Sequence, residues 1–543
     1  MEKDHRLPRM LFSLLLSAAA LFGRHLHITS PYFGRMHDNY ILPFGWTDLL
    51  LLALLTALFT FLLGILFRAL DRAPGELCTD APALAGRRGR FFLILLLLFA
   101  CWLPYLLHYS PGFLFTDTVI SLEEAIGEAP LDNRNPVLFT LFLRLCFLLT
   151  GDLTATCLLF SLSQMLCMAA TLSYLICWLQ ARGRLKRGWV ILLVLLFGLN
   201  PYAAALSVAS WKDPLFSAAL VLWSLLLADL ALSLSSPALA ALVRRRSWKL
   251  LFAFLTLFLL FWRNNGFSAV LAAAAVLLVP VLRRRGAAFR HALLICLAGL
   301  LFWAVMVMPV YRSLGISTPK EEGGGILLNQ VARVAACEGE MNAEERAYLD
   351  ELLPLEAYPD AYRPCCVDLL KWDSRLNGSA LAGSRFLRSW IGLGLKNPRL
   401  YLEAWALQSY GFWALTRPEI DLNITNITAG VPFNTPGDGV LPVGSREIRF
   451  HSWLGHGLWD RLLPMDFWSI PLGLLNWAVL LTALYLLLRG RRALLLALAP
   501  SAGVMAGLLV LTPISYLARY EAGVQFLAPF FLLLLLRGGK RSS

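Results

Sequence analysis

The stretch LLLLALLTALFTFLLGILF, residues 49–67, decides the fold class of this chain. It contains no charged residue, and as a helix it is long enough to cross the roughly 30 Å hydrocarbon core of a bilayer. Similar apolar runs recur along the sequence and alternate with short polar segments. The sequence therefore predicts an all-α, polytopic membrane protein.

The composition of the 543 residues supports this prediction. Hydrophobic residues make up 58% of the chain and charged residues 15%, and the mean hydropathy of +0.64 lies far outside the soluble globular range. The apolar runs predict about 12 transmembrane helices. Besides 49–67, they cover residues 10–23, 91–109, 153–179, 189–206, 215–234, 252–262, 267–282, 293–310, 467–488, 494–511 and 524–536.

The formal net charge of +13 raises the question of nucleic acid, but the distribution of Lys and Arg indicates membrane orientation instead. The basic residues gather in seven clusters, at residues 3–9, 68–90, 182–187, 244–249, 283–290, 489–492 and 537–541. These clusters alternate with weakly basic gaps, as the positive-inside rule expects of cytoplasmic loops. We predict a plasma-membrane protein embedded in the lipid bilayer, with both termini cytoplasmic and no nucleic-acid partner.

Residues 137–150 are apolar but too short to span, and a crossing there would move the basic cluster 182–187 to the outer face. We predict a juxtamembrane or re-entrant helix, which follows a first outer loop at 110–136. Residues 91–311 would then form the membrane core, after two N-terminal spans and a cytoplasmic loop in residues 1–90.

Residues 312–466 have an ordinary soluble composition and predict a mixed extracytoplasmic domain. Three C-terminal spans and a basic tail follow at 467–543. Within the domain, Asn342 and Glu345 have the spacing of a helix-capping box. One disulfide is also permitted there, from Cys337 to Cys365 or Cys366.

Ionisable and amide side chains gather at the predicted outer ends of the spans. They are Asp117, Asp132, Arg134, Asn135, Lys212, Asp213, Arg263, Asn264, Asn265, Arg519 and Tyr520. Basic residues should be scarce on this face, so their gathering predicts one functional site. Taken singly, Lys212 or Arg519 also fits interfacial snorkelling, and Asp117 also fits a helix N-cap.

Carboxylates in the first outer loop could act as a general base, while arginine and lysine side chains could hold a lipid phosphate. Asn329, Arg333 and residues 371–373 of the outer domain could line an acceptor groove. No phosphate loop, dinucleotide fingerprint or zinc signature occurs in the sequence.

The motifs PGFLFTDT (111–118), DNRNPVLFTLFL (132–143) and the late RY (519–520) resemble elements of the multi-spanning glycosyltransferases of the GT-C class. SWKDPLF (210–216) and FWRNNGF (261–267) are similar to features of a mostly uncharacterised bacterial branch of that class. The resemblance covers roughly residues 91–536. Asn135 and Pro136 stand where the class has a His-Pro pair.

This resemblance implies an inverting transferase that moves a sugar from a polyprenyl-phosphate donor to an envelope glycan, lipid or protein. It makes Asp117 the first candidate for the general base and Asp132 the second. Lys212, Arg263 and Arg519 would hold the donor phosphate, with Arg134, Asn135, Asp213, Asn264, Asn265 and Tyr520 in support. A divalent metal is compatible with the class, but the spacing of the carboxylates is a weak ligand pattern, so no metal or other cofactor is assigned.

Other functional classes remain open. A transporter or flippase suits a dozen spans, although ionisable residues near the bilayer midplane and repeated halves, which are typical of transporters, are scarce in this sequence. A polysaccharide polymerase or ligase would share the outer arginines but would not need the carboxylate of the first loop. A structural or sensor protein of the envelope would need fewer interfacial charges.

Overall fold

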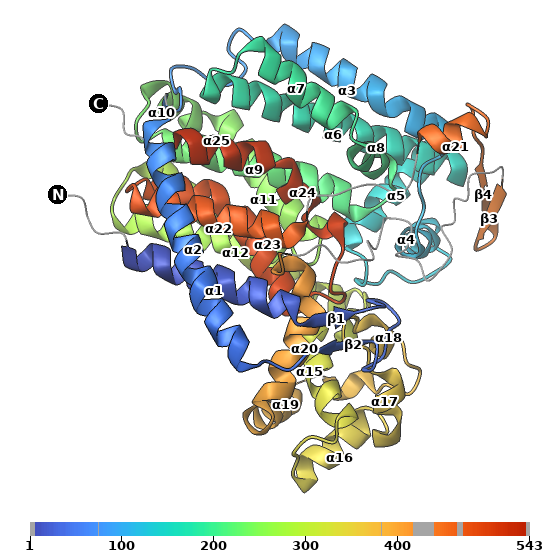
Figure 1. Cartoon of the computed structure of the whole chain (residues 1–543). Helices are drawn as coiled ribbons and strands as arrows, with labels where there is room; N and C mark the ends of the chain where they lie inside the picture. Colours follow the sequence, from blue (N-terminus) through green and yellow to red (C-terminus); the bar gives the residue numbers. More distant parts are fainter. Residues whose placement is uncertain (1–5, 74, 382, 416–438, 464–470, 539–543) are drawn as a thin grey trace.

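Apolar helices packed side by side form most of the computed structural model, which describes residues 6–73, 75–381, 383–415, 439–463 and 471–538 (Figure 1). Seven helices are long and apolar enough to cross a membrane. They are α1 (Arg6–Arg24), α2 (Trp46–Arg72), α3 (Arg88–His108), α6 (Leu153–Gly183), α9 (Lys212–Leu232), α13 (Ala287–Val305), whose span continues to Ser313, and α23 (Leu495–Leu511), whose span begins at Arg492.

Two further spans are possible if each of two bent pairs counts as one crossing. The helices α7 (Arg187–Gly198) and α8 (Pro201–Val208) meet at 54°. The second pair, bent by 42°, joins residues Ala518–Phe526, which include α24 (Ala522–Phe526), to α25 (Ala528–Arg537). The chain is therefore a multi-pass helical membrane protein with seven to nine candidate spans within its described residues.

Three further predicted spans, outside these seven helices and two bent pairs, form helices of only 17 residues, about 26 Å long at 1.5 Å per residue. These are α11 (Arg246–Trp262), α12 (Gly266–Leu282) and α22 (Leu472–Leu488). The first two are short because the polar turn Arg263–Asn265 ends one helix and begins the next. The short apolar helix predicted at 137–150 is α5 (Val137–Thr150), with the predicted bounds.

The remaining helices are short. They are α4 (Thr116–Ile126), α10 (Pro237–Arg244), α14 (Tyr311–Ser313), α15 (Gly325–Ala336), α16 (Ala343–Leu352), α17 (Tyr358–Ala361), α18 (Asp368–Lys371), α19 (Ser384–Lys396), α20 (Pro398–Ser409) and α21 (Leu458–Leu462). Two antiparallel hairpins complete the fold, β1 (Leu26–Ile28) with β2 (Asn39–Ile41) and β3 (Gly439–Val443) with β4 (Arg446–Phe450).

Helix α9 lies at the centre of the bundle. All of its residues except Lys212 and Leu222 are buried, and it packs against α6, α11, α23 and α24. A helix that is apolar on every side satisfies its surface only when other helices surround it. The first turn of α9 is therefore held in a fixed place by the whole bundle, and this turn carries Lys212 and Asp213.

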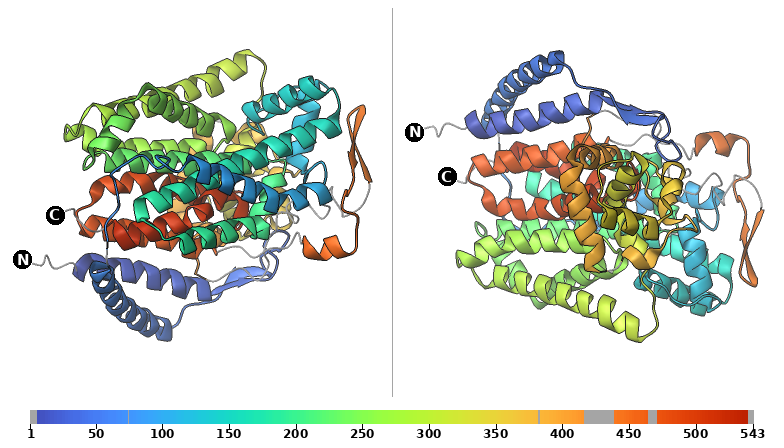
Figure 2. Two further views of the ribbon diagram at one scale, coloured as in Figure 1. Left: turned by 90° about the horizontal axis from the view of Figure 1, so that it is seen from above. Right: turned by 90° about the horizontal axis from the view of Figure 1, so that it is seen from below.

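Helices α15 to α20 project from one end of the bundle and enclose a second hydrophobic cluster (Figures 1 and 2). Leu328, Tyr348 and Tyr358 are fully buried in it. The predicted capping box is confirmed, because Asn342 accepts from the backbone of Glu345 and Glu345 accepts from that of Asn342. Residues 416–438 and 464–470 of the predicted domain, and parts of the basic clusters at both termini, lie outside the described residues.

The β1–β2 hairpin between the two N-terminal spans packs on this projecting group. Leu26, Ile28 and Ile41 cover a small buried cluster that includes Cys365 and Leu407. All ten cysteines are free, so the disulfide that the sequence permitted is not formed. Cys365 and Cys366 are buried, whereas Cys337 is exposed with its Sγ 3.6 Å from the Sδ of Met36.

The two sides of the membrane can be distinguished by thiol labelling. Cys337 is exposed on the projecting helices, and Cys78 lies near the basic end of α2. We expect a membrane-impermeant maleimide added to intact cells to label a variant that keeps only Cys337, but to label a Cys78-only variant only after permeabilisation. The reverse pattern would overturn the predicted orientation of the termini.

Candidate functional site

The loop that leads into α4 is tied to the loop between α8 and α9. Phe113 donates its backbone N–H to Val208 and accepts from Ser210, at 3.0 and 2.8 Å. Gly112 makes the approach possible, because its φ is +133° and a Cβ there would lie 2.2 Å from the Oγ of Ser161. Phe115 then stacks on Trp211 with ring centroids 3.6 Å apart. These contacts place the first turn of α4 beside the first turn of α9.

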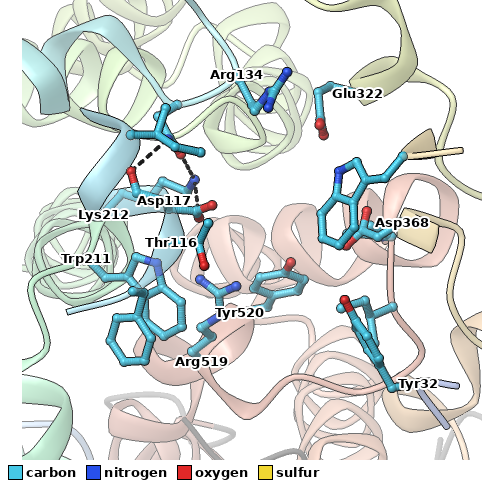
Figure 3. Close-up of a pocket in the computed structure, with 16 residues that line it drawn as sticks. Tyr32, Thr116, Asp117, Arg134, Trp211, Lys212, Glu322, Asp368, Arg519 and Tyr520 are labelled. Atoms are coloured by element: carbon cyan, nitrogen blue, oxygen red, sulfur yellow. Dashed lines mark hydrogen bonds and ion pairs between the residues drawn. The ribbon is translucent and has the colours of Figure 1, made fainter. Parts of the chain in front are cut away.

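A cavity of about 420 Å³ opens between these two turns and the projecting helices (Figure 3). Six of the side chains predicted for the site line it: Asp117, Arg134, Asn135, Lys212, Arg519 and Tyr520. They come from segments that are distant in the sequence. The remaining lining residues are Tyr32, Phe115, Thr116, Ile120, Trp211, Glu322, Asp368, Trp372, Pro513 and Ile514.

Asp117, Lys212 and Asn135 bind one another at one wall of the cavity. The Nζ of Lys212 lies 3.0 Å from the Oδ2 of Asp117 and donates to the Oδ1 of Asn135 at 2.5 Å. The amide of Asn135 in turn donates to the backbone carbonyl of Asp117 at 3.0 Å. Asn135 thus orients both partners of the ion pair.

Directly behind Lys212, the carboxylate of Asp213 lies between two arginines. Its side chain is fully buried, with Oδ1 3.2 Å from Arg263 and Oδ2 2.7 Å from Arg519. The guanidinium of Arg519 stacks over Trp211 at 3.5 Å, and that of Arg263 lies 4.6 Å from the ring centroid of Tyr520. This buried Arg–Asp–Arg group connects Arg263 to the cavity, although Arg263 itself does not line it.

The opposite wall of the cavity comes from the projecting helices and the N-terminal hairpin (Figure 3). Glu322, in the 3-10 turn η2 (Lys320–Gly323), and Asp368 both lie 3.1 Å from the Nζ of Lys371. Lys371 is buried behind the wall, whereas Trp372 is exposed and faces the cavity. Tyr32 reaches the same wall from the turn between β1 and β2.

Besides Asp213 and Arg263, three residues predicted for the site do not line the cavity. The Oδ1 of Asp132 accepts from the backbone N–H of Arg134 at 2.5 Å, and Asp132 does not line the cavity. Asn264 donates to the carbonyls of Asn133 and Arg134 and so supports that loop. Asn265 is the N-cap residue of α12, without a side-chain capping bond.

The predicted acceptor groove is only partly formed. Trp372 lines the cavity, but Asn329 donates to backbone carbonyls at Arg363 and Pro364. Arg333 pairs with Glu403, which gives it a structural role. Asp373 pairs with Arg375 at 2.7 Å and does not line the cavity.

The charges around Asp117 keep its carboxylate ionised. Burial acts to raise its pKa, but the nearby charges of Lys212 and Arg519 outweigh that effect and hold the pKa below its ordinary value of 3.8. Asp117 lies in the first turn of α4, whereas the N-cap is Phe115, so the alternative prediction of an N-capping role for Asp117 is wrong. Its side chain is 34% exposed, which leaves the carboxylate accessible from the cavity.

No group of three or more His, Cys, Asp or Glu side chains among the described residues is arranged to hold a metal ion. Asp117 faces the ammonium of Lys212, and Asp132 lies outside the cavity. The positive charge in this site is supplied by side chains.

Sequence reasoning missed Tyr32, Glu322 and Asp368. Tyr32 lies in a short turn between two spans, and the two carboxylates lie in a segment of soluble composition. The only signal nearby was the prediction for residues 371–373, which lie next to Asp368 along the chain.

The buried group of Arg263, Asp213 and Arg519 leads to a prediction about the free energy of unfolding. In Asp213→Ala, Arg263 and Arg519 lose their counter-charge, so we expect the free energy of unfolding to fall by about 3–5 kcal/mol in an SDS titration. Glu351→Ala, which breaks the exposed pair of Glu351 with Arg385, is the control and should cost less than about 1 kcal/mol. Similar losses in both variants would contradict this account of the group.

The buried carboxyl group of Glu124 in α4, which accepts a hydrogen bond from Thr140 of α5 at 3.1 Å, predicts how stability depends on pH. Burial raises its pKa from 4.5 to about 7. Between these values the folded protein keeps a proton that the unfolded chain loses, so stability should fall as pH rises, by on the order of 3 kcal/mol in all. We expect Glu124→Gln to flatten the change in thermal unfolding midpoint between pH 5 and pH 8. An unchanged pH dependence in this variant would refute the assignment.

The comparisons with known proteins identify a family. A model described as a family of unknown function (DUF6020) matches residues 126–425, which is more than half of the chain. No curated protein and no solved structure matches the chain. The match includes Asn135, Lys212 and Asp368, whereas Asp117 and Arg519 lie outside it. The chain therefore belongs to the DUF6020 family.

Proposed function

We propose that this protein is an integral membrane glycosyltransferase that moves a sugar from a polyprenyl-phosphate donor to an acceptor outside the cytoplasm. The observation that carries the proposal is that an accessible carboxylate, Asp117, lies beside the cationic side chains of Lys212, Arg134 and Arg519 in one cavity. The proposal takes both termini as cytoplasmic and the projecting helices as extracytoplasmic. The resemblance to the GT-C class supports the same chemistry.

The wall of the cavity that carries Lys212, Arg134 and Arg519, called the cationic wall below, has a charge that fits a phosphate group. Arg263 lies directly behind this wall. These four cations oppose two carboxylates, Asp117 and Asp213, which leaves an excess of two positive charges. A sugar phosphodiester carries one negative charge, and the phosphate monoester that leaves carries about −1.5 to −2 at pH 7. The wall therefore favours the leaving group more strongly than the intact donor, as catalysis requires.

The proposed reaction proceeds by direct displacement with inversion. Asp117 takes the proton of an acceptor hydroxyl as its oxygen forms a bond to the anomeric carbon, while the bond from that carbon to the phosphate oxygen breaks. Lys212 and Arg519 stabilise the departing polyprenyl phosphate. The position of the cavity at the ends of apolar helices allows the isoprenoid chain to remain among those helices.

A transporter of lipid-linked or small solutes is the second candidate. Its support is the presence of two bent helix pairs, since broken helices form the substrate sites of many transporters. Lys212 follows one pair along the chain and Arg519 lies in the other. A polymerase or ligase of lipid-linked glycans would use the same cationic wall. Neither alternative requires Asp117 as a base.

The proposal is tested by transfer of radiolabelled sugar from a panel of polyprenyl-phosphate monosaccharides, with the purified protein in lipid. We expect transfer from at least one donor and a loss of at least 100-fold in kcat for Asp117→Asn, because general-base catalysis contributes about 10²–10⁴-fold. Glu123→Gln alters a carboxylate on the same helix that does not line the cavity and should retain transfer.

Undiminished transfer by Asp117→Asn would remove the assigned base and favour the polymerase or ligase. Absence of transfer from every donor, combined with uptake of a lipid-linked substrate into sealed vesicles, would favour the transporter.

A further inference from the structure

The hydroxyl of Tyr32 is buried in the protein without a hydrogen-bond partner among the described residues. Tyr32 is only 5% exposed, and its Oη has no donor or acceptor within reach. Its ring packs with Cys366, Ile514 and Leu517, and the residue lines the cavity. Figure 3 shows the hydroxyl directed toward the side where Asp368 and Tyr520 lie. Buried hydroxyls are almost always hydrogen-bonded, so a bound ligand is a natural partner for this one.

The carboxylates beside Tyr32 present oxygen atoms to the cavity and share one buried lysine. Lys371 is buried behind them and lies 3.1 Å from both Glu322 and Asp368. One ammonium therefore offsets one of the two carboxylate charges, while the remaining lone pairs of Glu322 and Asp368 are available to the cavity that they line. This arrangement suits ligand hydroxyl groups, which donate to carboxylates and accept from a tyrosine.

Trp372 adds an apolar surface to the same wall. It is 58% exposed at the end of α18, the helix that begins at Asp368, and both residues line the cavity. An exposed indole next to hydrogen-bonding groups can cover the apolar face of a sugar ring while its edge hydroxyls are bound. The burial of Tyr32 and the pairing of the carboxylates are independent observations that favour the same kind of ligand.

We propose that Tyr32, Glu322, Asp368 and Trp372 form a binding subsite for an uncharged, hydroxyl-rich acceptor, that is, a carbohydrate. This proposal rests on the proposed glycosyltransferase function, because it places the acceptor opposite the cationic wall that would hold the donor. An acceptor hydroxyl that points away from this subsite faces Asp117 across the cavity (Figure 3). The subsite is thus assigned to the selection of the acceptor and not to the chemical step.

The proposal also gives a role to the two N-terminal spans. They hold the β1–β2 hairpin, whose strands pack on the cluster around Leu407. Arg35 of the hairpin pairs with Asp360 on the projecting helices at 3.1 Å. The hairpin therefore fixes Tyr32 relative to Asp368 and Trp372, although these residues lie more than 300 positions apart in the sequence.

Tyr32→Phe separates a ligand-binding role from a structural one. Because its hydroxyl has no partner within the described protein, its removal should leave the thermal unfolding midpoint unchanged or slightly higher. Loss of a hydrogen bond to the acceptor should raise the KM for the acceptor about fivefold to tenfold and leave the donor KM unchanged. Tyr40→Phe, at an exposed position of the same hairpin, is the matched control and should change neither constant.

A binding measurement without donor makes the subsite testable apart from the transferase. Uncharged methyl glycosides of hexoses and N-acetylhexosamines are titrated into the protein in lipid nanodiscs by calorimetry. We expect binding to the wild type, about fivefold to tenfold weaker binding to Tyr32→Phe and Asp368→Asn, and a larger loss in Trp372→Ala.

Each outcome has a distinct meaning. Glycoside binding that weakens in Tyr32→Phe supports the subsite, even if no polyprenyl-phosphate donor is turned over and the transferase proposal fails. No binding of any glycoside to the wild type, or equal binding to Tyr32→Phe and wild type, overturns the subsite. Preferential binding of cationic amines over the methyl glycosides also overturns it.

Discussion

The buried carboxylate of Asp213 is the point on which the candidate site depends. Two guanidinium groups inside a protein are costly unless a counter-charge lies within contact distance, and Asp213 lies within 3.2 Å of both Arg263 and Arg519. The three residues come from the start of α9, the turn between α11 and α12, and the segment before α24. Their neutralisation requires these three segments of the bundle to meet at one place.

Helix geometry explains why Lys212 and Asp213, although adjacent in the sequence, have different partners. Lys212 and Asp213 are consecutive in the first turn of α9, so their side chains point in directions about 100° apart. Asp213 faces the buried arginines while Lys212 faces the cavity and Asp117. One turn therefore supplies both the internal neutralisation and a cation for a ligand. Gln164 of α6 supports it by donating to the carbonyls of Ser207, near the end of α8, and Ala209, in the loop before α9.

The sequence was a good guide to the cationic wall and a poor guide to the opposite wall, for physical reasons. A lysine or arginine at the outer end of a span stands out against apolar flanks and against the expected scarcity of positive charge there, so Lys212, Arg263 and Arg519 were all recognisable. Glu322 and Asp368 have no such contrast, because carboxylates are common in a segment of soluble composition. Tyr32 is brought to the cavity only by the packing of a hairpin on residues far along the chain.

Asp132 was expected to be reactive, but its carboxylate accepts from a neighbouring backbone amide in its own loop, a local bond that spacing alone does not reveal. Within the described residues, seven to nine of the predicted spans have the length and composition of a full crossing, and the polar turn between α11 and α12 limits each of these two helices to 17 residues.

The cavity takes residues from both sides of the segment that matches the family model. Residues 126–425 supply Asn135, Lys212 and Asp368, whereas Asp117 precedes this segment and Arg519 follows it. The ion pair of Lys212 with Asp117 and that of Asp213 with Arg519 both cross its limits. A chain restricted to the matched segment would leave Lys212 and Asp213 without these partners, at a position where unpaired charge is expensive. The flanking spans therefore belong to the same structural unit as the matched segment, and the cavity is complete only when both flanks have packed against it.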